Sequence, residues 1–446
     1  MSRKKKLQKK IAVAVSVVNL LNMGAPMVLP YVNVAGRMPA AGGQIVQFAD
    51  TAQSVLYGTA HAANYTVPPD STVDVMNAND TMNVNNGGTG TVTTMTGGVQ
   101  NVNSGGAGTV VTMSGGRQII NNGGTGTVTT MNGGEQIVSS GGTGTVSSLQ
   151  NGGTQIVYNG GMAISTTIDN GGTQSALSGG TATDTTLKNK GKQIVSSGGV
   201  ASGGTFSGVN TNTRGYQEVY EGGTVVGAIF SAFGNQTVTG GMARDTTVTS
   251  GGIQAITNKG VSLNATIMSG GTQSATEGGI LAGTQTIEAG ASASGGTLKE
   301  ISVEGKTFKG VQNVNSGGTA NNITVTGGGT QFVLSGGTAN GVTLDGGTLS
   351  MAGGAIASGT VGGHGRVVYD GGSGQISLGG TNNFSSFTVS GGTLETLNGF
   401  QVNSSGGITV NSGGTLIAGG AVTVQTSGSS LTVSGGGTFS ATRIST

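Results

Sequence analysis

The 446-residue sequence contains no cysteine and no tryptophan, and its five prolines all lie at or before residue 69. The absence of cysteine excludes disulfide bonds and thiolate metal sites. Proline cannot donate a hydrogen bond to a β-ladder, so its absence after Pro69 permits one continuous sheet system over the remaining chain. Charged residues make up 8% and aromatic residues 4% of the sequence. These low values argue against both a disordered chain and a compact globular core.

Positive charge is scarce outside the amino-terminal segment. Seven of the 19 Lys and Arg residues precede residue 63, where Asp50 is the sole acidic residue. The rest of the chain has 12 basic and 16 acidic residues. Because nucleic-acid binding requires a basic face, the sequence after residue 62 predicts no nucleic-acid partner.

The amino-terminal segment has the features of an export signal. Residues 2–10 are strongly basic and residues 11–21 are mostly apolar, which is typical of the first two regions of a secretory signal peptide. A small-x-small cleavage site follows at Ala60-His61-Ala62. We therefore predict that residues 1–62 form an extended signal peptide that is cleaved after Ala62, with an uncleaved anchor as the alternative.

Glycine is abundant, with 91 residues, and much of it occurs in a repeated unit. The unit Gly-Gly-x-Gln-x-Val recurs about every 19 residues, with a second Gly-Gly pair between successive copies. A fixed period of this size indicates one structural unit that stacks on copies of itself. The glutamines assigned to the repeat are Gln100, Gln118, Gln136, Gln155, Gln174, Gln193, Gln217, Gln236, Gln254, Gln273, Gln312 and Gln331.

The repeat predicts short strands separated by tight corners. Gln136 and Val138, like Gln155 and Val157, lie two residues apart, which is the spacing of one face of a strand. The Gly-Gly pairs supply the positive φ angles that the corners need. We therefore predict an all-β fold, a right-handed parallel β-helix (β-solenoid) of about 19-residue rungs, with the right hand taken from the general crossover preference. Stacked glutamines would bond amide to amide, and stacked apolar residues would form a thin core.

The regularity of the repeat also predicts how the chain is divided into segments. After the signal peptide we expect a cap or lead-in over residues 63–84, the regular repeat over 85–345 and a less regular continuation over 346–446. Two irregular segments, between Gln193 and Gln217 and between Gln273 and Gln312, are expected to form protruding loops, which on a solenoid either bind partners or are merely solvated. The notable residues are Arg214, Tyr216, Glu218, Tyr220 and Glu221 in and just after the first segment, and Lys299, Glu300, Glu304, Lys306 and Lys309 in the second.

The glycine-rich motifs do not indicate a phosphate or calcium site. Residues 124–127, Gly-Thr-Gly-Thr, lack the Lys-Ser/Thr that completes a phosphate-binding loop and recur at 142–145, as structural corners would. Calcium-binding solenoid repeats need an aspartate after the glycine-rich turn, where this chain most often has Thr, Val or Met. We therefore predict no metal site and no cofactor.

The acidic residues and histidine do not form a recognisable catalytic set either. Asp184 and Asp245 occupy equivalent repeat positions about three rungs apart, too far for a carboxylate pair. Glu218 and Glu221 are expected to share one exposed loop face. His364, the only histidine after residue 62, has no carboxylate at a spacing that suggests pairing. We therefore predict no catalytic residues and no enzyme, with a β-helix polysaccharide lyase or glycosidase as the alternative.

The pattern Gly-Gly-x-Gln-x-Val-x-x-Gly-Gly-x-Ala/Gly-x-x-Thr-x-Val/Leu, as in residues 133–149 and 171–187, resembles the repeats of AIDA-type autotransporter adhesins. The resemblance covers most of residues 85–345. It implies a passenger on the surface of a Gram-negative cell, or released from it, that acts as an adhesin or self-association scaffold toward host-cell or sister-cell components. In that family rung Ser and Thr residues can carry heptose, and comparable positions here are Thr129, Thr130, Ser147 and Ser148.

The carboxyl-terminal segment departs from the family pattern. Members of the family end in a translocating β-barrel of alternating strands. Residues 346–446 are instead glycine-rich, and no set of transmembrane strands fits there. The alternatives are a truncated chain, a separately encoded outer-membrane translocator barrel as a partner, or a released protein.

Overall fold

A computed structural model describes residues 54–56, 64–67, 71–196, 198–425 and 428–445. The described residues form strands and turns, with no helix among them, and so with none that is long and apolar enough to cross a membrane. They divide into two compact units. The described residues of the first lie within Met1–Thr167 and Gly171–Gln174, and those of the second lie within Ile168–Asn170 and Ser175–Thr446.

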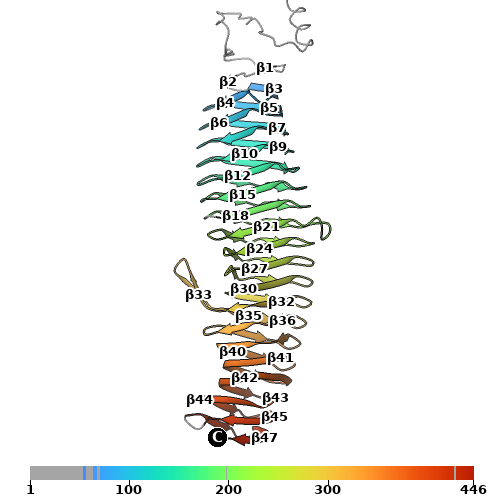
Figure 1. Cartoon of the computed structure of the whole chain (residues 1–446), viewed down its shortest axis with the longest axis vertical. Coiled ribbons are helices and arrows are strands. Elements are labelled where there is room, and N and C mark those ends of the chain that lie inside the picture. Colours follow the sequence, from blue (N-terminus) through green and yellow to red (C-terminus); the bar gives the residue numbers. More distant parts are fainter. Residues whose placement is uncertain (1–53, 57–63, 68–70, 197, 426–427, 446) are drawn as a thin grey trace, which may run out of the picture. The chain divides into compact units, whose positions relative to one another are not determined.

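The first unit is a stack of parallel strands in successive rungs (Figure 1). One series of strands consists of β2, β4, β6, β8, β10 and β12, and the other of β1, β3, β5, β7, β9, β11 and β13. From β3 to β12, residues that pair lie 18 or 19 positions apart, as Gln118 does from Gln136 and Gln136 from Gln155. The strands are β1 (Ser54–Leu56), β2 (Asn64–Val67), β3 (Ser71–Met76), β4 (Thr81–Val84), β5 (Thr89–Met95), β6 (Val99–Val102), β7 (Ala107–Met113), β8 (Arg117–Ile120), β9 (Thr125–Met131), β10 (Glu135–Val138), β11 (Thr143–Leu149), β12 (Thr154–Val157) and β13 (Met162–Ile164).

The second unit repeats the arrangement with three strands to a rung. Its first side carries β18, β21, β24 and β27, its second side β16, β19, β22, β25 and β28, and its third side β17, β20, β23, β26 and β29. In sequence, β14 (Thr167–Ile168) and β15 (Thr173–Leu177) span the unit boundary. The three-sided rungs comprise β16 (Thr181–Thr183), β17 (Thr186–Leu187), β18 (Lys192–Ser196), β19 (Val200–Ser202), β20 (Thr205–Phe206), β21 (Tyr216–Tyr220), β22 (Thr224–Val226), β23 (Ile229–Phe230), β24 (Asn235–Thr239), β25 (Met242–Arg244), β26 (Thr247–Val248), β27 (Ile253–Thr257), β28 (Val261–Leu263) and β29 (Thr266–Ile267).

Further along the second unit, several strands are long enough to continue around a corner of the solenoid. One example is β30, which pairs with both β27 and β28. These strands are β30 (Thr272–Ala282), β31 (Thr284–Ile287), β32 (Ser292–Leu298), β33 (Ile301–Val303), β34 (Lys306–Phe308), β35 (Val311–Val314), β36 (Thr319–Asn321), β37 (Thr324–Thr326), β38 (Thr330–Val333), β39 (Thr338–Asn340), β40 (Thr343–Ala352), β41 (Ile356–Asp370), β42 (Ser373–Ser390), β43 (Gly392–Thr396), β44 (Phe400–Val410), β45 (Gly414–Val424), β46 (Ser430–Val433) and β47 (Thr438–Ser445).

The parallel β-solenoid with the expected rung length is confirmed, while its right hand stays a prediction. The predicted signal peptide lies outside the described residues except for 54–56, which form β1 and pair with β3. Cleavage after Ala62, which also stays a prediction, would remove that strand. The expected lead-in over residues 63–84 contains β3 and β4, which already pair with β5 and β6 of the repeat.

The core is a set of columns in which each rung buries one or two side chains from each strand. In the first unit Met95, Met113 and Met131 stack in register and are fully buried. In the second unit Phe206 stacks on Phe230 of the next rung, with ring centroids 4.5 Å apart. Since each side chain packs mainly on its copies above and below, the apolar core of a rung is buried by its neighbours.

Candidate functional site

The inward-facing glutamines form a hydrogen-bonded ladder, which we call the glutamine ladder. In the first unit each Nε2 donates to the Oε1 of the preceding rung, at distances of 2.6–2.7 Å, through Gln100, Gln118, Gln136, Gln155 and Gln174. In the second unit the same bonds, also of 2.6–2.7 Å, join Gln193, Gln217, Gln236, Gln254 and Gln273. All of these side chains are buried. The amides therefore satisfy one another inside a core with no access to water.

Most ladder glutamines have a small residue opposite them on the next strand, usually eight positions later, whereas Gln217 and Gln273 face Val225 and Leu281. Gly126 is the second residue of β9 and faces inward, and a Cβ added there would clash with the Ile120 side chain and lie 2.8 Å from Gln118 Oε1. Later rungs place Ala163 and Ala182 at this position. Our interpretation of residues 124–127 as a corner is therefore wrong for Gly126, because this glycine lies within a strand and makes room for the Ile120 and Gln118 side chains.

Buried hydroxyl groups near the ladder are a feature that the sequence analysis missed. Thr166 Oγ1 donates to Gln155 Oε1 at 2.9 Å, and Ser262 Oγ donates to Gln254 Oε1 at 3.1 Å. Gln193 Nε2 donates to Thr185 Oγ1 at 3.0 Å. A signal was present in the sequence, since Thr166 follows Gln155 and Thr185 follows Gln174 by 11 positions, but threonine is common on both faces of these strands.

The ladder changes sides between β30 and β35. Gln273 pairs in register with Gln254 below and with Ala293 above, on the first side of the solenoid. Gln285, only 12 residues after Gln273, lies on the third side and pairs with Gln312, which pairs with Gln331. Assigning Gln273 and Gln312 to one column was therefore wrong, and Gln285, which is fully buried, was missed because it breaks the period.

The cause of this change is the loss of one strand from the repeat. After Gln273 the chain forms the first and second sides within β30 and then begins the next repeat unit on the third side, at Gln285. Gln273 Nε2 also donates to Gln285 Oε1 at 3.2 Å, across the core. Among the described residues the ladder ends carry buried amide atoms without a hydrogen-bond partner: Gln273 Oε1, Gln312 Nε2 and Gln331 Oε1.

Asp184 and Asp245 are corner residues. Both have positive φ angles, of 53° and 55°. Their equivalents on the two intervening rungs are Gly203 and Gly227, so three rung steps, roughly 14 Å, separate the two carboxylates. This exceeds the 5–9.5 Å of a glycosidase carboxylate pair.

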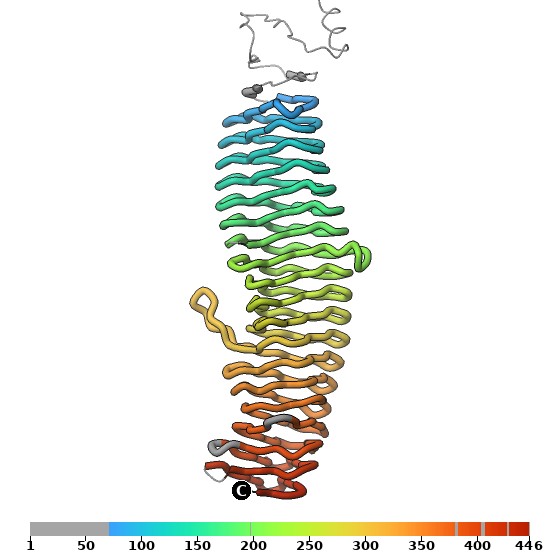
Figure 2. The backbone as a smooth tube through the Cα atoms, in the orientation of Figure 1, coloured from blue at the N-terminus to red at the C-terminus, as the bar shows by residue number. Residues whose placement is uncertain are grey.

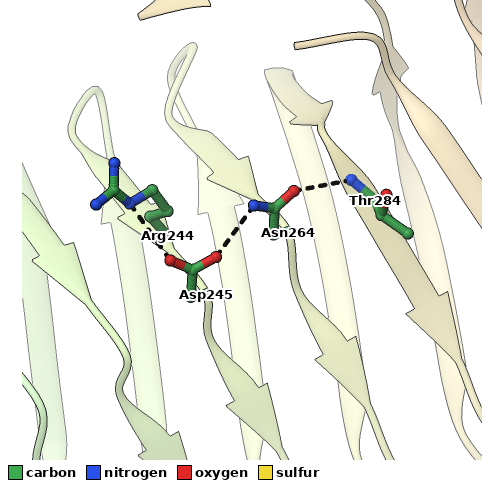
Figure 3. Close-up of polar contacts among 4 residues, drawn as sticks. All are labelled: Arg244, Asp245, Asn264 and Thr284. Carbon is green, nitrogen blue, oxygen red and sulfur yellow. Dashed lines mark hydrogen bonds and ion pairs between the residues drawn. The ribbon is translucent and has the colours of Figure 1, made fainter. Parts of the chain in front are cut away.

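Figure 3 shows what such a corner carboxylate does. Asn264 Nδ2 donates to Asp245 Oδ1 at 3.0 Å, and the Thr284 backbone N–H donates to Asn264 Oδ1 at 2.9 Å. The Arg244 guanidinium lies 3.4 Å from the other oxygen of Asp245. The side chains thus link three consecutive rungs at one corner, which is a structural role.

The Glu218 carboxylate is paired on the surface of a regular rung. Tyr216, Glu218 and Tyr220 belong to β21, so the irregular segment protrudes before them, and the expected common loop face of Glu218 and Glu221 is not formed. Glu218 Oε2 lies 2.8 Å from Lys192 Nζ and accepts a 2.7 Å hydrogen bond from the Tyr220 hydroxyl. That hydrogen bond raises the pKa of Tyr220.

His364 has a carboxylate partner, contrary to our expectation. Its Nε2 lies 3.1 Å from Asp345 Oδ1, and the two residues are register partners on β41 and β40. They occupy equivalent positions of successive rungs, so the pairing follows directly from rung stacking. Both side chains are more than half exposed. No group of three or more His, Cys, Asp or Glu residues that could hold a metal ion occurs in the part of the chain that the structure describes.

Tyr369 is the largest fully buried side chain described, and its hydroxyl has no hydrogen-bond partner among the described residues. Burial raises the pKa of this phenol above its ordinary value of 10.0. Because folding favours the protonated form, the stability contribution is intact below pH 10.0 and is lost as the pH rises through the folded-state pKa.

We expect Tyr369→Phe to raise the free energy of unfolding by about 1 kcal/mol, since it removes an unsatisfied buried hydroxyl. Urea unfolding of the full chain followed by circular dichroism measures this, and alkaline absorbance titration should lose one of its late tyrosine steps. Tyr158→Phe, at an exposed position, is the control and should change neither quantity. A less stable Tyr369→Phe variant would contradict the burial argument.

Two segments protrude from the second unit, at the places where the period breaks (Figure 2). The first is the loop of residues 207–215, which is closed by the Thr213 hydroxyl accepting hydrogen bonds from the Val209 and Asn210 N–H groups. The second is an antiparallel hairpin of β33 and β34. The predicted loop between Gln273 and Gln312 is thus an ordered two-stranded sheet.

Outward-facing hydroxyl groups recur in register in the first unit. One column, whose side chains are half-buried, consists of Thr91, Thr109, Thr127 and Thr145 on β5, β7, β9 and β11. Thr129 and Ser147 are exposed on the same strands, and Thr130 and Ser148 are half-buried. The solenoid therefore presents the same chemical group repeatedly along one face.

No family model matches the chain, and no curated protein matches it. Among solved structures, the chain is similar to the crystal structure of the TibC-catalyzed hyper-glycosylated TibA55-350 fragment. The sequences are 34% identical, and the match covers 65% of this chain and 97% of the fragment. The TM-score is 0.42. The chain is a parallel β-solenoid with sequence similarity to nearly the whole of that TibA fragment.

Proposed function

We propose that the chain is a secreted, cell-surface passenger of a Gram-negative bacterium that acts in adhesion or self-association. The observation that carries the proposal is the in-register column of outward threonines, Thr91, Thr109, Thr127 and Thr145. Identical groups that repeat every rung, roughly 4.8 Å apart, suit many weak contacts with a repetitive surface. The resemblance of the repeats to AIDA-type adhesins supports the same function.

The enzymatic alternative, a polysaccharide lyase or glycosidase, has no observation in its favour among the described residues. The Asp184 and Asp245 carboxylates are too far apart, and Asp245 is bonded to corner neighbours. Glu218 is engaged by Lys192 and Tyr220. The His364–Asp345 pair lies on an open surface with both side chains largely exposed. Catalysis by general acid and base needs positioned groups in a site that excludes water.

We expect adhesion to fall in a graded way when the threonine column loses its hydroxyl groups. Thr→Val keeps the side-chain shape and the strand propensity but removes the hydroxyl. A single Thr127→Val change should alter cell attachment by less than about twofold, while the fourfold variant at positions 91, 109, 127 and 145 should lower it by about tenfold or more, because avidity multiplies weak contacts. Attachment is measured by counting sister-cell aggregates formed by cells that produce the full chain.

The fourfold Thr→Ser variant is the matched control, since it keeps every hydroxyl at the same positions and should retain attachment. Complete loss from one substitution would indicate a single pocket and contradict the proposal. Surface display is tested separately by protease treatment of intact cells. Survival of the chain in cells treated this way would count against its exposure on the surface.

A further inference from the structure

The outward face of β21 carries two tyrosines with a carboxylate between them. Tyr216, Glu218 and Tyr220 alternate with the buried Gln217 and Val219, so all three side chains point away from the core. Along the strand, the positions of Tyr216 and Tyr220 are about 13 Å apart. No other strand among the described residues has two tyrosines on its outer face. We call the row of Tyr216, Glu218 and Tyr220 the β21 platform.

The Glu218 carboxylate is held in one orientation, and one of its oxygens stays available. Lys192 Nζ lies 2.8 Å from Glu218 Oε2, and the Tyr220 hydroxyl donates to the same oxygen at 2.7 Å. Glu218 Oε1 has no hydrogen-bond partner among the described residues, and the Glu218 side chain is 25% exposed. The platform therefore presents one oriented acceptor, and the ion pair with Lys192 leaves the platform without net charge.

The loop of residues 207–215 stands at one end of the platform, because the loop ends at Gly215 and β21 begins at Tyr216 (Figure 2). The loop is ordered by bonds within it. Asn212 N–H donates to Asn210 Oδ1 at 2.9 Å, and Gly215 N–H closes the loop by donating to Ser207 O at 2.9 Å. Residues 209–212 are exposed. An ordered loop of this kind presents amide and hydroxyl groups and loses little conformational entropy when it binds a ligand.

The side chains of the platform match the chemistry of a neutral glycan. A sugar ring has an apolar face of C–H groups, which packs on an aromatic ring, and hydroxyl groups at its edge, which donate to carboxylate oxygens. Tyrosine supplies a large, rigid contact area at a low cost in conformational entropy. An anionic ligand would require a positive field. The platform lacks one, because Lys192 is paired with Glu218.

We propose that the β21 platform and the adjoining loop bind a neutral glycan of more than one sugar unit. Sugar rings pack on Tyr216 and Tyr220, a sugar hydroxyl group donates to Glu218 Oε1, and the loop contacts the glycan at the Tyr216 end. This inference names a class of partner for the adhesion in the proposed function and rests on it. Each chain supplies one such platform, and many chains on one cell multiply its affinity.

Binding of the purified full chain to a panel of immobilised neutral and acidic oligosaccharides tests the proposal. We expect the chain to bind at least one neutral oligosaccharide of two or more sugar units. Tyr216→Ala and Tyr220→Ala should each lower the affinity for it by about tenfold or more, the usual effect of truncating an aromatic anchor. Tyr220→Phe should lower the affinity less, because the ring stays while the hydrogen bond that orients Glu218 is lost.

Tyr158→Ala is the matched control, since it removes a tyrosine that is similarly exposed, at 42%, but lies outside the platform. It should bind the same oligosaccharide as well as the unchanged chain does. Circular dichroism checks that every variant keeps its β-sheet signal. The proposal is overturned if the chain binds no neutral oligosaccharide, if it binds acidic ones alone, or if the Tyr216→Ala and Tyr220→Ala variants bind normally.

Failure of the proposed function is distinguishable from failure of this inference. If cells that produce the chain do not attach although the purified chain binds a neutral oligosaccharide through the platform, the proposed function is wrong and the glycan site stands. If cells attach while the purified chain binds no neutral oligosaccharide, the glycan site is wrong and adhesion uses other contacts.

Discussion

Replacing Gln136 by leucine is expected to lower the free energy of unfolding of the first unit by roughly 2–6 kcal/mol, the cost of two buried polar groups left without partners. Leucine has a similar volume, so the effect comes from the ladder. Gln136 donates to Gln118 Oε1 at 2.7 Å and accepts from Gln155 Nε2 at 2.6 Å. Its removal orphans that acceptor and that donor, and each such group costs about 1–3 kcal/mol. Urea unfolding of the full chain, with native-state hydrogen exchange to locate the loss, measures the change.

The matched control is Gln331→Leu, at the far end of the ladder. Gln331 donates to Gln312 Oε1 at 2.7 Å, while its own Oε1 has no partner among the described residues. Replacing Gln331 leaves Gln312 Oε1 without its donor but also removes the unpartnered Gln331 Oε1. The expected loss in the free energy of unfolding is therefore below about 1 kcal/mol. The next rung already has Leu349 in register at this position. If Gln136→Leu and Gln331→Leu lower the free energy of unfolding equally, the hydrogen bonds of the ladder add no stability beyond side-chain packing.

Replacing Gly134 by alanine is the second change with a large expected effect, a loss of about 2–5 kcal/mol from backbone strain and a steric clash together. Gly134 turns a corner of the first unit with φ of 76°. An L-residue in this region costs about 1–2 kcal/mol. The added Cβ would also lie 2.8 Å from Gly116 O and 2.9 Å from Gly115 C. Those atoms belong to the backbone of the rung below, so relief of the clash requires a rung to move, at a further cost of about 1–3 kcal/mol. Thermal and urea unfolding of the full chain test this.

Gly152→Ala separates the two contributions. Gly152 lies in a corner of the same unit with φ of 84°, but a Cβ there meets nothing within 4 Å. The expected loss is therefore the conformational part alone, about 1–2 kcal/mol. If Gly134→Ala and Gly152→Ala lower the free energy of unfolding equally, the steric contact with the rung below does not contribute to the need for glycine at position 134.

Several features of the structure were predictable because they follow from the spacing of residues along the chain. Gln136 and Val138 lie two positions apart, and strand geometry places both on the inner face. A repeat length of 18 or 19 residues means that equivalent residues meet in register, as Gln118 and Gln136 do. The same rule applied to His364 would have found Asp345, one rung earlier, but both lie at or beyond the end of the regular repeat, where the period is hard to follow.

Other elements could not be predicted because their causes lie on another rung. Gly126 resembles a corner glycine in sequence, yet it is small because Ile120 and Gln118 of the preceding strand fill the space beside it. The corner role of Asp245 depends on Asn264, which lies 19 residues later. Whether residues 301–308 form a loop or a hairpin depends on the pairing of Ile301 with Phe308. Neither residue belongs to the repeat, so the repeat length does not predict this pairing.

By itself, the sequence determined that the chain is a β-solenoid. Its short repeat has paired glycines for corners and alternating inward residues for strands, and such units bury their inward residues by stacking on equal rungs. Only the tertiary structure decided on which side each rung begins. The repeat unit reads the same before Gln273 and after Gln312, yet it occupies different sides of the solenoid, because one strand is missing between them. A repeat specifies its own strands and corners, whereas its position around the axis depends on how many strands precede it.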